Sequence, residues 1–374
     1  MPNTLGDYTF IITDLLTGFI IDEVELSSMN WDEVYNRPGA GSATARLDDP
    51  KTTEANFSAW QNALWAIKDG DIRWCGFMGN VAPRGGSRVI NVPLYGFEEY
   101  LRYQLVVNQQ NMSYATSADN FRTTKWSQID QFQIVEDLVK HGQRNSIQSN
   151  IGLEVVYDQL SGVLRDETIS QWNAKFVGER IEELTDNIDG FDWYYEYYWD
   201  GTTPKVRMRL KYPRGPRYTN VFLEYDNDPG NTNIVQYDVD GGDRPASRML
   251  GLGAGEDLDQ VYAFSSEVKP GNVNYDDVYS NLDVTDVNTL QQQIDGIRLT
   301  RDKVRNSIQI VLDQNLDPHY TTYRPGDALK VRIDDGFVQI DGFYTTVSKS
   351  IVLSKEHDEV VTVSLLDVLV DVTT

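Results

Sequence analysis

The sequence Tyr323-Arg324-Pro325-Gly326-Asp327, followed by Leu329-Lys330-Val331-Arg332-Ile333, decides how the end of this chain is interpreted. Adjacent proline and glycine favour a turn, and the run behind them alternates apolar and charged residues, as a strand with one buried face does. A second strand-like run, Gly342-Phe343-Tyr344-Thr345-Thr346-Val347-Ser348-Lys349-Ser350, follows. The pattern predicts strands joined by a turn.

The rest of the last third, from about residue 233, adds further strands and one helix. Strand-like runs cover residues 234–239, 248–255, 261–268, 307–312 and 360–372. Asp286 can cap a helix that runs to about Arg301. The apolar stripe of this helix consists of Leu290, Ile294 and Ile297. We therefore expect residues 233–374 to form a small barrel-like domain of strands and one helix.

The first hundred residues show a similar order of elements. Residues 8–12 and 16–26 are β-branched and aromatic runs that suit a hairpin, and residues 72–78 and 87–94 read as two further strands. Between these pairs an apolar pattern with spacings of three and four predicts an amphipathic helix. Its members are Phe57, Trp60, Leu64 and Ile67. A small barrel with one helix against its side is the expected structure of residues 1–105.

The middle of the chain combines helices with a hairpin. One helix is expected from Gln128 to His141, and another begins near a capping Thr168. The stripe of the second helix is Trp172, Phe176, Val177, Ile181, Leu184 and Ile188. Residues 191–199 and 206–212 then flank a turn at Asp200-Gly201, which predicts a hairpin.

The predicted fold class is therefore β-rich α+β. Two small β-barrel-like domains, residues 1–105 and 233–374, flank an α+β insert formed by residues 106–232. The two ends share a composition and an order of elements, without residue-level repetition.

The net charge of the chain limits which kinds of binding partner we expect. The 374 residues include 57 acidic and 33 basic side chains, which gives a formal charge of −24. Proteins that bind nucleic acid tightly through its phosphates need a basic surface. Because acidic residues outnumber basic ones here, we do not expect tight nucleic-acid binding. The excess of acidic side chains suits either a protein surface past which DNA slides without binding or a protein that its charge keeps in solution. Cys75 is the only cysteine, which excludes an internal disulfide, and the N-terminal sequence is typical of neither a signal peptide nor a membrane span.

Catalytic motifs are not found. The histidines are His141, His319 and His357, and none lies in a recognisable motif, while the sequence G-x-S-x-G does not occur. The aromatic run Phe191 to Trp199 could stack on sugars, but its alternation is equally explained by a sheet packed on both sides. With 57 carboxylates, no acid pair stands out.

Metal and cofactor motifs fail at named positions. The segments Asp226–Asn231 and Asp238–Asp243 resemble calcium loops but lack the required glycine at position six and glutamate at position twelve. Gly251-Leu252-Gly253-Ala254-Gly255 is followed by a strand-like run instead of the helix that a dinucleotide site needs. We expect no catalytic, cofactor-binding or metal-binding residues, and no cofactor.

The order of segments resembles the baseplate hub, or minor tail protein, family of long-tailed bacteriophages. The resemblance rests on Ile72-Arg73-Trp74-Cys75-Gly76-Phe77, on Tyr95-Gly96-Phe97-Glu98-Glu99-Tyr100-Leu101, and on the C-terminal runs from Tyr323 to Ser350. It implies a structural virion protein at the tail tip, assembled in the host cytoplasm. The family also implies a homotrimer, in which three pairs of tail-tube-like barrels form a ring of six around a channel.

The resemblance further implies the partners of such a hub. They are the distal tail protein, the tape measure protein and other tail-tip or fibre proteins, with DNA present only in transit during ejection. One alternative is a peripheral minor tail protein that binds a host receptor or carbohydrate, and another is a cell-wall hydrolase of the glycosidase or peptidase class.

Overall fold

A computed structural model describes residues 8–82, 85–117, 122–144, 147–187, 189–226, 232–240, 245–267, 273–282, 284–300, 307–354 and 359–367. Most of these residues lie in strands. The chain divides into two compact units. The larger unit contains residues 1–235 and 311–363, and the smaller unit contains residues 236–310 and 364–374.

A sheet of thirteen strands dominates the structure. Its strands are β1 (Tyr8–Asp14), β2 (Ile20–Val24), β3 (Ser28–Val34), β4 (Ala40–Arg46), β5 (Asn62–Lys68), β6 (Asp71–Met78), β7 (Val89–Tyr95), β13 (Arg217–Asp226), β14 (Ile234–Asp240), β18 (Ser307–Leu312), β19 (Asp327–Asp334), β20 (Gln339–Ser354) and β21 (Val360–Asp367). The order is β14-β18-β21-β20-β3-β4-β7-β6-β5-β1-β2, and β19 additionally joins β20 to β13.

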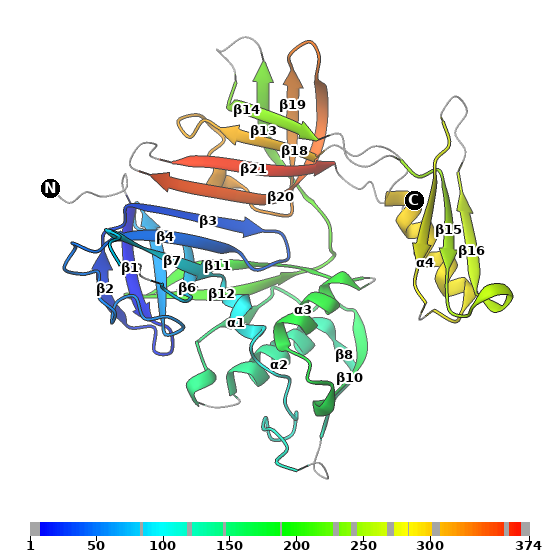
Figure 1. Cartoon of the computed structure of the whole chain (residues 1–374), viewed down its shortest axis with the longest axis horizontal. Helices are drawn as coiled ribbons and strands as arrows, with labels where there is room; N and C mark the ends of the chain where they lie inside the picture. The colour runs from blue at the N-terminus through cyan, green and yellow to red at the C-terminus, as the bar shows by residue number, and fades with distance from the viewer. Residues whose placement is uncertain are drawn as a thin grey trace. The chain divides into compact units, whose positions relative to one another are not determined.

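The strand β20 links the two ends of the chain within this sheet. Its first half pairs with β19, and its second half pairs with β3, where Ile351 lies opposite Trp31. Figure 1 shows β20 beside β3, although more than 300 residues separate them in sequence. Because β20 is 16 residues long, one strand can pair with both sets; its buried positions have even numbers up to Thr346 and odd numbers from Lys349 onward.

This pairing differs from the two separate barrels that the sequence predicts. The N-terminal and C-terminal strand sets share one sheet, and the described strands close no barrel. The prediction of a β-rich α+β chain is confirmed, whereas the barrel layout is not. The domain edges near residues 105 and 232 stay predictions.

The helix expected over Phe57, Trp60, Leu64 and Ile67 is wrong. The first two residues lie in turns, and the other two belong to β5, which pairs with β1 on one side and β6 on the other. Six of the seven residues of β5 are buried, so both of its faces are apolar. A strand buried on both faces loses the alternation that distinguishes it from a helix.

The insert packs on the large sheet. The helix α1 (Phe97–Leu101) precedes the insert. The helices of the insert are α2 (Gln131–Arg144) and α3 (Val177–Asp186), and its strands outside the large sheet are β8 (Thr123–Asp130), β9 (Glu154–Val156), β10 (Leu164–Ser170), β11 (Asp192–Asp200) and β12 (Thr203–Lys211). Short 3₁₀ turns cover Ile147–Ser149, Gln171–Asn173 and Tyr320–Thr322. The ring of Trp65 on β5 contacts Phe97 and Tyr197, so one core joins sheet and insert.

Two predictions for the insert are confirmed and one is corrected. The helix near residues 128–141 is α2, and the hairpin around Asp200-Gly201 is β11–β12. The second helix begins at Val177 instead of near Thr168, because residues 164–170 form β10 and pair with β8. Strand pairing here overrides the helical spacing of the apolar residues.

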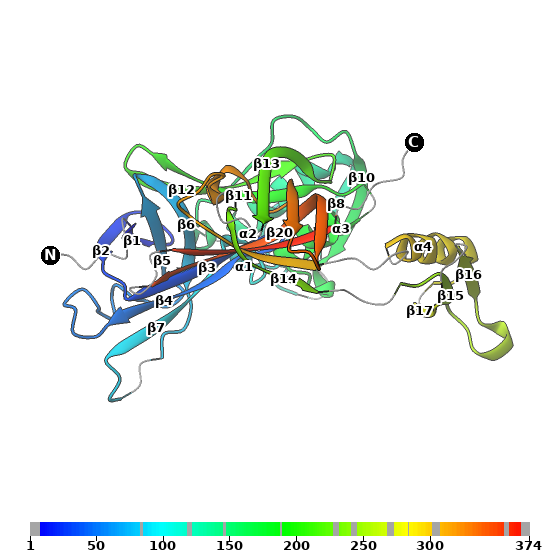
Figure 2. The same cartoon turned by 90° about the horizontal axis from the view of Figure 1, so that it is seen from above.

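The smaller unit is a three-stranded sheet covered by one helix. It contains β15 (Arg248–Leu252), β16 (Tyr262–Ser266), β17 (Asp276–Ser280), α4 (Val287–Thr300) and a 3₁₀ turn at Asp257–Asp259. Figure 2 shows α4 along one face of this sheet. The predicted cap is confirmed, since Asp286 accepts a hydrogen bond of 2.7 Å from the amide of Thr289. A side chain at Gly251 would meet Ile294 of α4 at 2.6 Å, which gives this glycine a packing role.

Candidate functional site

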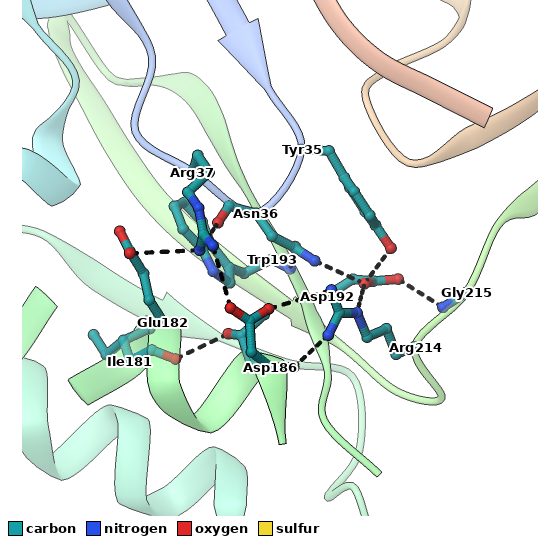
Figure 3. A network of polar contacts seen from close by, with 11 residues as sticks. Tyr35, Asn36, Arg37, Ile181, Glu182, Asp186, Asp192, Trp193, Arg214 and Gly215 are labelled. Carbon is teal, nitrogen blue, oxygen red and sulfur yellow. Dashed lines mark hydrogen bonds and ion pairs between the residues drawn. The ribbon is translucent and has the colours of Figure 1, made fainter. Parts of the chain in front are cut away.

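Asp192, at the start of β11, joins three separate segments of the larger unit (Figure 3). The residue is 6% exposed, and its carboxylate accepts hydrogen bonds from the Tyr35 hydroxyl at 2.5 Å and the Asn36 amide at 3.0 Å. The backbone amide of Gly215 donates to its other oxygen at 3.1 Å. A buried carboxylate needs several donors, and here they come from the turn after β3 and from the segment after β12.

Asn36 completes this connection from the other side. Its φ angle of 53° lies in the left-handed region, which asparagine tolerates better than most residues. Its side-chain oxygen accepts a hydrogen bond of 2.8 Å from the backbone amide of Trp193. The amide group of Asn36 therefore binds both the backbone and the side chain at the start of β11.

Two arginines extend the network to α3 (Figure 3). Arg37 forms ion pairs with Glu182 at 3.4 Å and with Asp186 at 3.2 Å. Arg214 contacts Asp186 at 3.4 Å and lies 3.9 Å from Asp192. Burial, with the Asp192 carboxylate, raises the pKa of the Tyr35 hydroxyl well above its ordinary value. Tyr35 thus remains a hydrogen-bond donor. We call this network the clamp at Asp192; it consists of Tyr35, Asn36, Arg37, Glu182, Asp186, Asp192, Arg214 and Gly215.

A cleft of about 530 Å³ lies in the larger unit between the end of β3, the strands β6 and β11, and the loop 320–325. Lys349 of β20 forms part of its wall and is only 3% exposed. The ammonium group of Lys349 pairs with Glu33 at 2.9 Å and donates to the carbonyl oxygens of Tyr320 and Tyr323 at 3.3 and 3.1 Å. This buried lysine fixes the loop 320–325 against β3.

Glu98, in the first turn of α1, is fully buried. Neither of its carboxylate oxygens has a hydrogen-bond partner among the described residues. Burial and the neighbouring Glu182 raise its pKa well above the ordinary value, and Arg102 opposes this shift only in part. Because the folded-state pKa is raised, the contribution of Glu98 to stability is complete below the unfolded pKa of about 4.3 and is lost as the pH rises.

We predict that Glu98→Gln stabilises the protein more at high pH than at low pH. The variant should gain up to about 1.4 kcal/mol relative to the wild type for each pH unit between about pH 5 and the folded-state pKa. Urea denaturation at about pH 5 and about pH 8 measures this difference. A difference that is independent of pH would show that Glu98 is ionised in the folded protein.

The residues that the sequence singled out do not converge on one site. Cys75 is a buried free thiol whose pKa is raised by burial. His141 is buried near Trp126, burial lowers its pKa although Asp137 opposes the shift, and neither ring nitrogen has a partner among the described residues. His319 caps the 3₁₀ turn at Tyr320–Thr322 by accepting from the amide of Thr321. His357 lies outside the described residues.

The two segments that resemble calcium loops are only partly described by the structure. Most of Asp226–Asn231, and the end of Asp238–Asp243, lie outside the described residues. Within the described ranges, no group of three or more histidine, cysteine or acidic side chains could hold a metal ion. No helix of the described chain is long and apolar enough to cross a membrane.

The aromatic run of β11 has the predicted alternation. Phe191 and Trp193 are in the core, and Tyr195 and Tyr197 pack against it. Tyr194 and Tyr198, on the opposite face, lie under the guanidinium groups of Arg324 and Arg207 at 4.2 and 4.8 Å. Packing on both faces therefore accounts for the run without a sugar.

Sequence reasoning missed the clamp around Asp192. Tyr35 is 157 residues from Asp192, Asn36 is 156 and Gly215 is 23, and no local pattern connects them. The one available signal was the breaker cluster Asn36-Arg37-Pro38-Gly39, which indicates a turn but not its contacts.

Comparison with known proteins gives a result only at the level of structure. No family model matches the sequence, and no curated protein matches it. The tail protein from Neisseria meningitidis MC58 superposes with a TM-score of 0.61 at 12% identity, covering 96% of both chains. The 43 kDa tail protein of prophage MuSo2 from Shewanella oneidensis gives a TM-score of 0.62 at 10% identity, covering 96% of this chain and 98% of its own. The chain has the fold of phage tail proteins.

A solved structure of a protein complex gives a similar result. A chain of the Francisella PdpA–VgrG complex matches with a TM-score of 0.53 at 11% identity, covering 96% of this chain and 57% of its own. In each of these three comparisons, the tail-protein fold includes both ends of the chain together with the insert.

Proposed function

We propose that the chain is a non-enzymatic structural protein of a phage tail, and that three copies form the hub at the tail tip. The observation that carries this proposal is the near-complete overlap with two tail proteins, which covers 96% or more of every chain involved. At such low identity the likeness establishes a fold, so the role of the chain is our inference from that fold.

The architecture suits a structural hub. The shared sheet and the clamp at Asp192 connect the N-terminal strands, the insert and the C-terminal strands of the larger unit. We propose that residues 1–105 and 233–374 contribute the barrel-like parts of a ring around the channel, and that residues 106–232 form the insert between them.

The net charge of −24 suits a channel through which DNA passes. Like charge prevents the phosphate backbone from adhering to the wall. We propose that the hub joins the tail tube and the distal tail protein to the tip. The tape measure protein and the tip or fibre proteins would be its other neighbours, in a virion tail assembled in the host cytoplasm.

We predict that the purified chain assembles as a trimer, alone or with its distal tail partner. The trimer would have a mass of about 128 kDa, three times the 42.6 kDa of one chain. Light scattering coupled to size-exclusion chromatography measures this mass directly. A chain that stays monomeric at high concentration, both alone and with the distal tail protein, would contradict the hub.

A further inference from the structure

The sheet of the smaller unit has one covered face and one open face. The helix α4 packs on the covered face, where it shares a core with Met249 and Ala263. Ser265 on the same face donates a hydrogen bond to Asp295 of α4. Successive side chains of a strand point to opposite faces. Because Met249 lies opposite Asp277 in the register, the even-numbered residues of β15, β16 and β17 point away from α4.

Strand register brings five apolar side chains together on the open face. Leu250 lies directly opposite Phe264 on one side and Val278 on the other. In the next row, Leu252 lies opposite Tyr262. Phe264, Val278 and Tyr262 are 57, 59 and 69% exposed. Neighbouring exposed apolar side chains mark an interaction site, whereas single ones do not. We call these five residues the open patch.

The sequence of β15 is typical of a strand that is covered on both faces. After Arg248 it continues as Met249-Leu250-Gly251-Leu252, without a polar residue. A strand with one face in water alternates apolar and polar residues instead. The strand β15 also pairs in parallel with β17, and parallel strands occur mostly in sheets with both faces covered. Both features indicate that the open patch packs against a second layer.

The charge around the open patch favours a basic partner. Residues 245–267, 273–282 and 284–300, which the structure describes, contain eight acidic and two basic residues. Arg248 already pairs with the carboxylate of Asp276 at 2.5 Å. Arg298 likewise pairs with Glu267 at 2.7 Å. The remaining carboxylates therefore give this part of the chain a negative field that attracts basic side chains.

The turn between β15 and β16 places part of this negative charge at one end of the open patch. It contains Glu256, Asp257 and Asp259, and none of them forms an ion pair with another described residue. Leu258, between them, is fully exposed. A second copy of the chain would bring the same acidic turn and the same net charge, so repulsion disfavours it as the occupant.

We propose that the open patch binds an amphipathic helix of a partner protein, with its lysine or arginine side chains beside the acidic turn. The helix α4 shows that this sheet packs against a helix on its other face, so a second helix would complete a three-layer arrangement. Burial of the apolar stripe supplies the affinity, and the opposite charges fix the orientation. The proposal does not rest on the trimer or on the hub.

The experiment measures binding of a fluorescein-labelled helical peptide to the full-length protein by anisotropy. The peptide has about 14 residues, with leucines on one face and lysines on the other. At about 150 mM salt, where long-range attraction is screened, we expect saturable binding. Phe264→Gln should weaken binding about tenfold, because the contact loses a buried aromatic ring. Replacing Asp257 and Asp259 together with asparagine should weaken it about threefold, since exposed ion pairs contribute little.

Matched controls separate the open patch from a general attraction to an acidic protein. Phe337→Gln removes an aromatic side chain that is 95% exposed between β19 and β20. Replacing Asp69 and Asp71 together with asparagine removes the same charge from the exposed turn before β6. Both controls should bind the peptide within about twofold of the wild type. A peptide with glutamine in place of leucine should bind at least about tenfold more weakly. Thermal unfolding of each variant confirms that it is folded.

Three results would overturn the proposal. A leucine–lysine peptide that does not bind at about 1 mM would exclude this kind of helix as the partner. An affinity that falls equally for Phe264→Gln and Phe337→Gln, or for neither, would place the peptide elsewhere on the surface. If Phe264→Gln lowered the mass of the full-length assembly in light scattering without peptide, a second copy of the chain would be the occupant of the open patch.

Discussion

Replacing Asp192 with alanine is expected to lower the free energy of unfolding by about 3–5 kcal/mol. The substitution removes the acceptor for the hydroxyl of Tyr35, the amide of Asn36 and the backbone amide of Gly215. Asn36 is buried and its amide loses its acceptor, the half-buried Tyr35 and Gly215 lose theirs, and Arg214 loses a nearby carboxylate. Urea denaturation followed by tryptophan fluorescence measures the change.

The matched control is Asp200→Ala at the other end of β11. Asp200 lies on the same strand, its side chain is 60% exposed, and it pairs with Lys205 in solvent. We expect only a small fraction of the effect of Asp192→Ala, because exposed ion pairs contribute little. Equal effects at both positions would show that the clamp does not hold the three segments together.

The second large effect is expected for Lys349→Met, with a loss of about 3 kcal/mol in the free energy of unfolding. Methionine has a similar length but no charge, so Glu33 loses its partner and the carbonyl oxygens of Tyr320 and Tyr323 lose a donor. The loop 320–325 should then detach from β3 before the rest of the unit unfolds. Hydrogen exchange of this loop, together with urea denaturation, tests both expectations.

Lys330→Met on the neighbouring strand β19 provides the comparison. Lys330 also pairs with a carboxylate, that of Asp341, and also lies over an aromatic ring, that of Phe343, but its side chain is 36% exposed. Water replaces the lost contacts there, so the effect should be much smaller. If both lysine variants lost the same stability, burial would not be the reason for the effect at Lys349.

Local patterns predicted the elements whose burial is one-sided. The helices α2 and α4 each have one apolar face and one polar face, so periodicity identifies them, and the turn at Asp200-Gly201 identifies the hairpin β11–β12. The strand β5 is buried on both faces, and its apolar spacing was mistaken for a helix. The start of α3 was placed too early because β10 pairs with β8, a contact that the local sequence does not show.

Long-range pairing limited the prediction of architecture and of the candidate site. The strand β20 pairs with β3 across more than 300 residues, and this pairing joins the strand sets that the sequence separated. Likewise, the clamp at Asp192 and the cleft gather side chains from segments that are distant in the sequence. Neither has a motif, because each position alone resembles an ordinary turn or strand residue.

Cryo-electron microscopy of the tail tip tests the central claim most directly. The hub account predicts that this chain forms a three-fold ring around an open channel, between the distal tail protein and the tip. The hub proposal would be contradicted if this chain were found as isolated copies on the side of the tail or in its fibres, away from the channel.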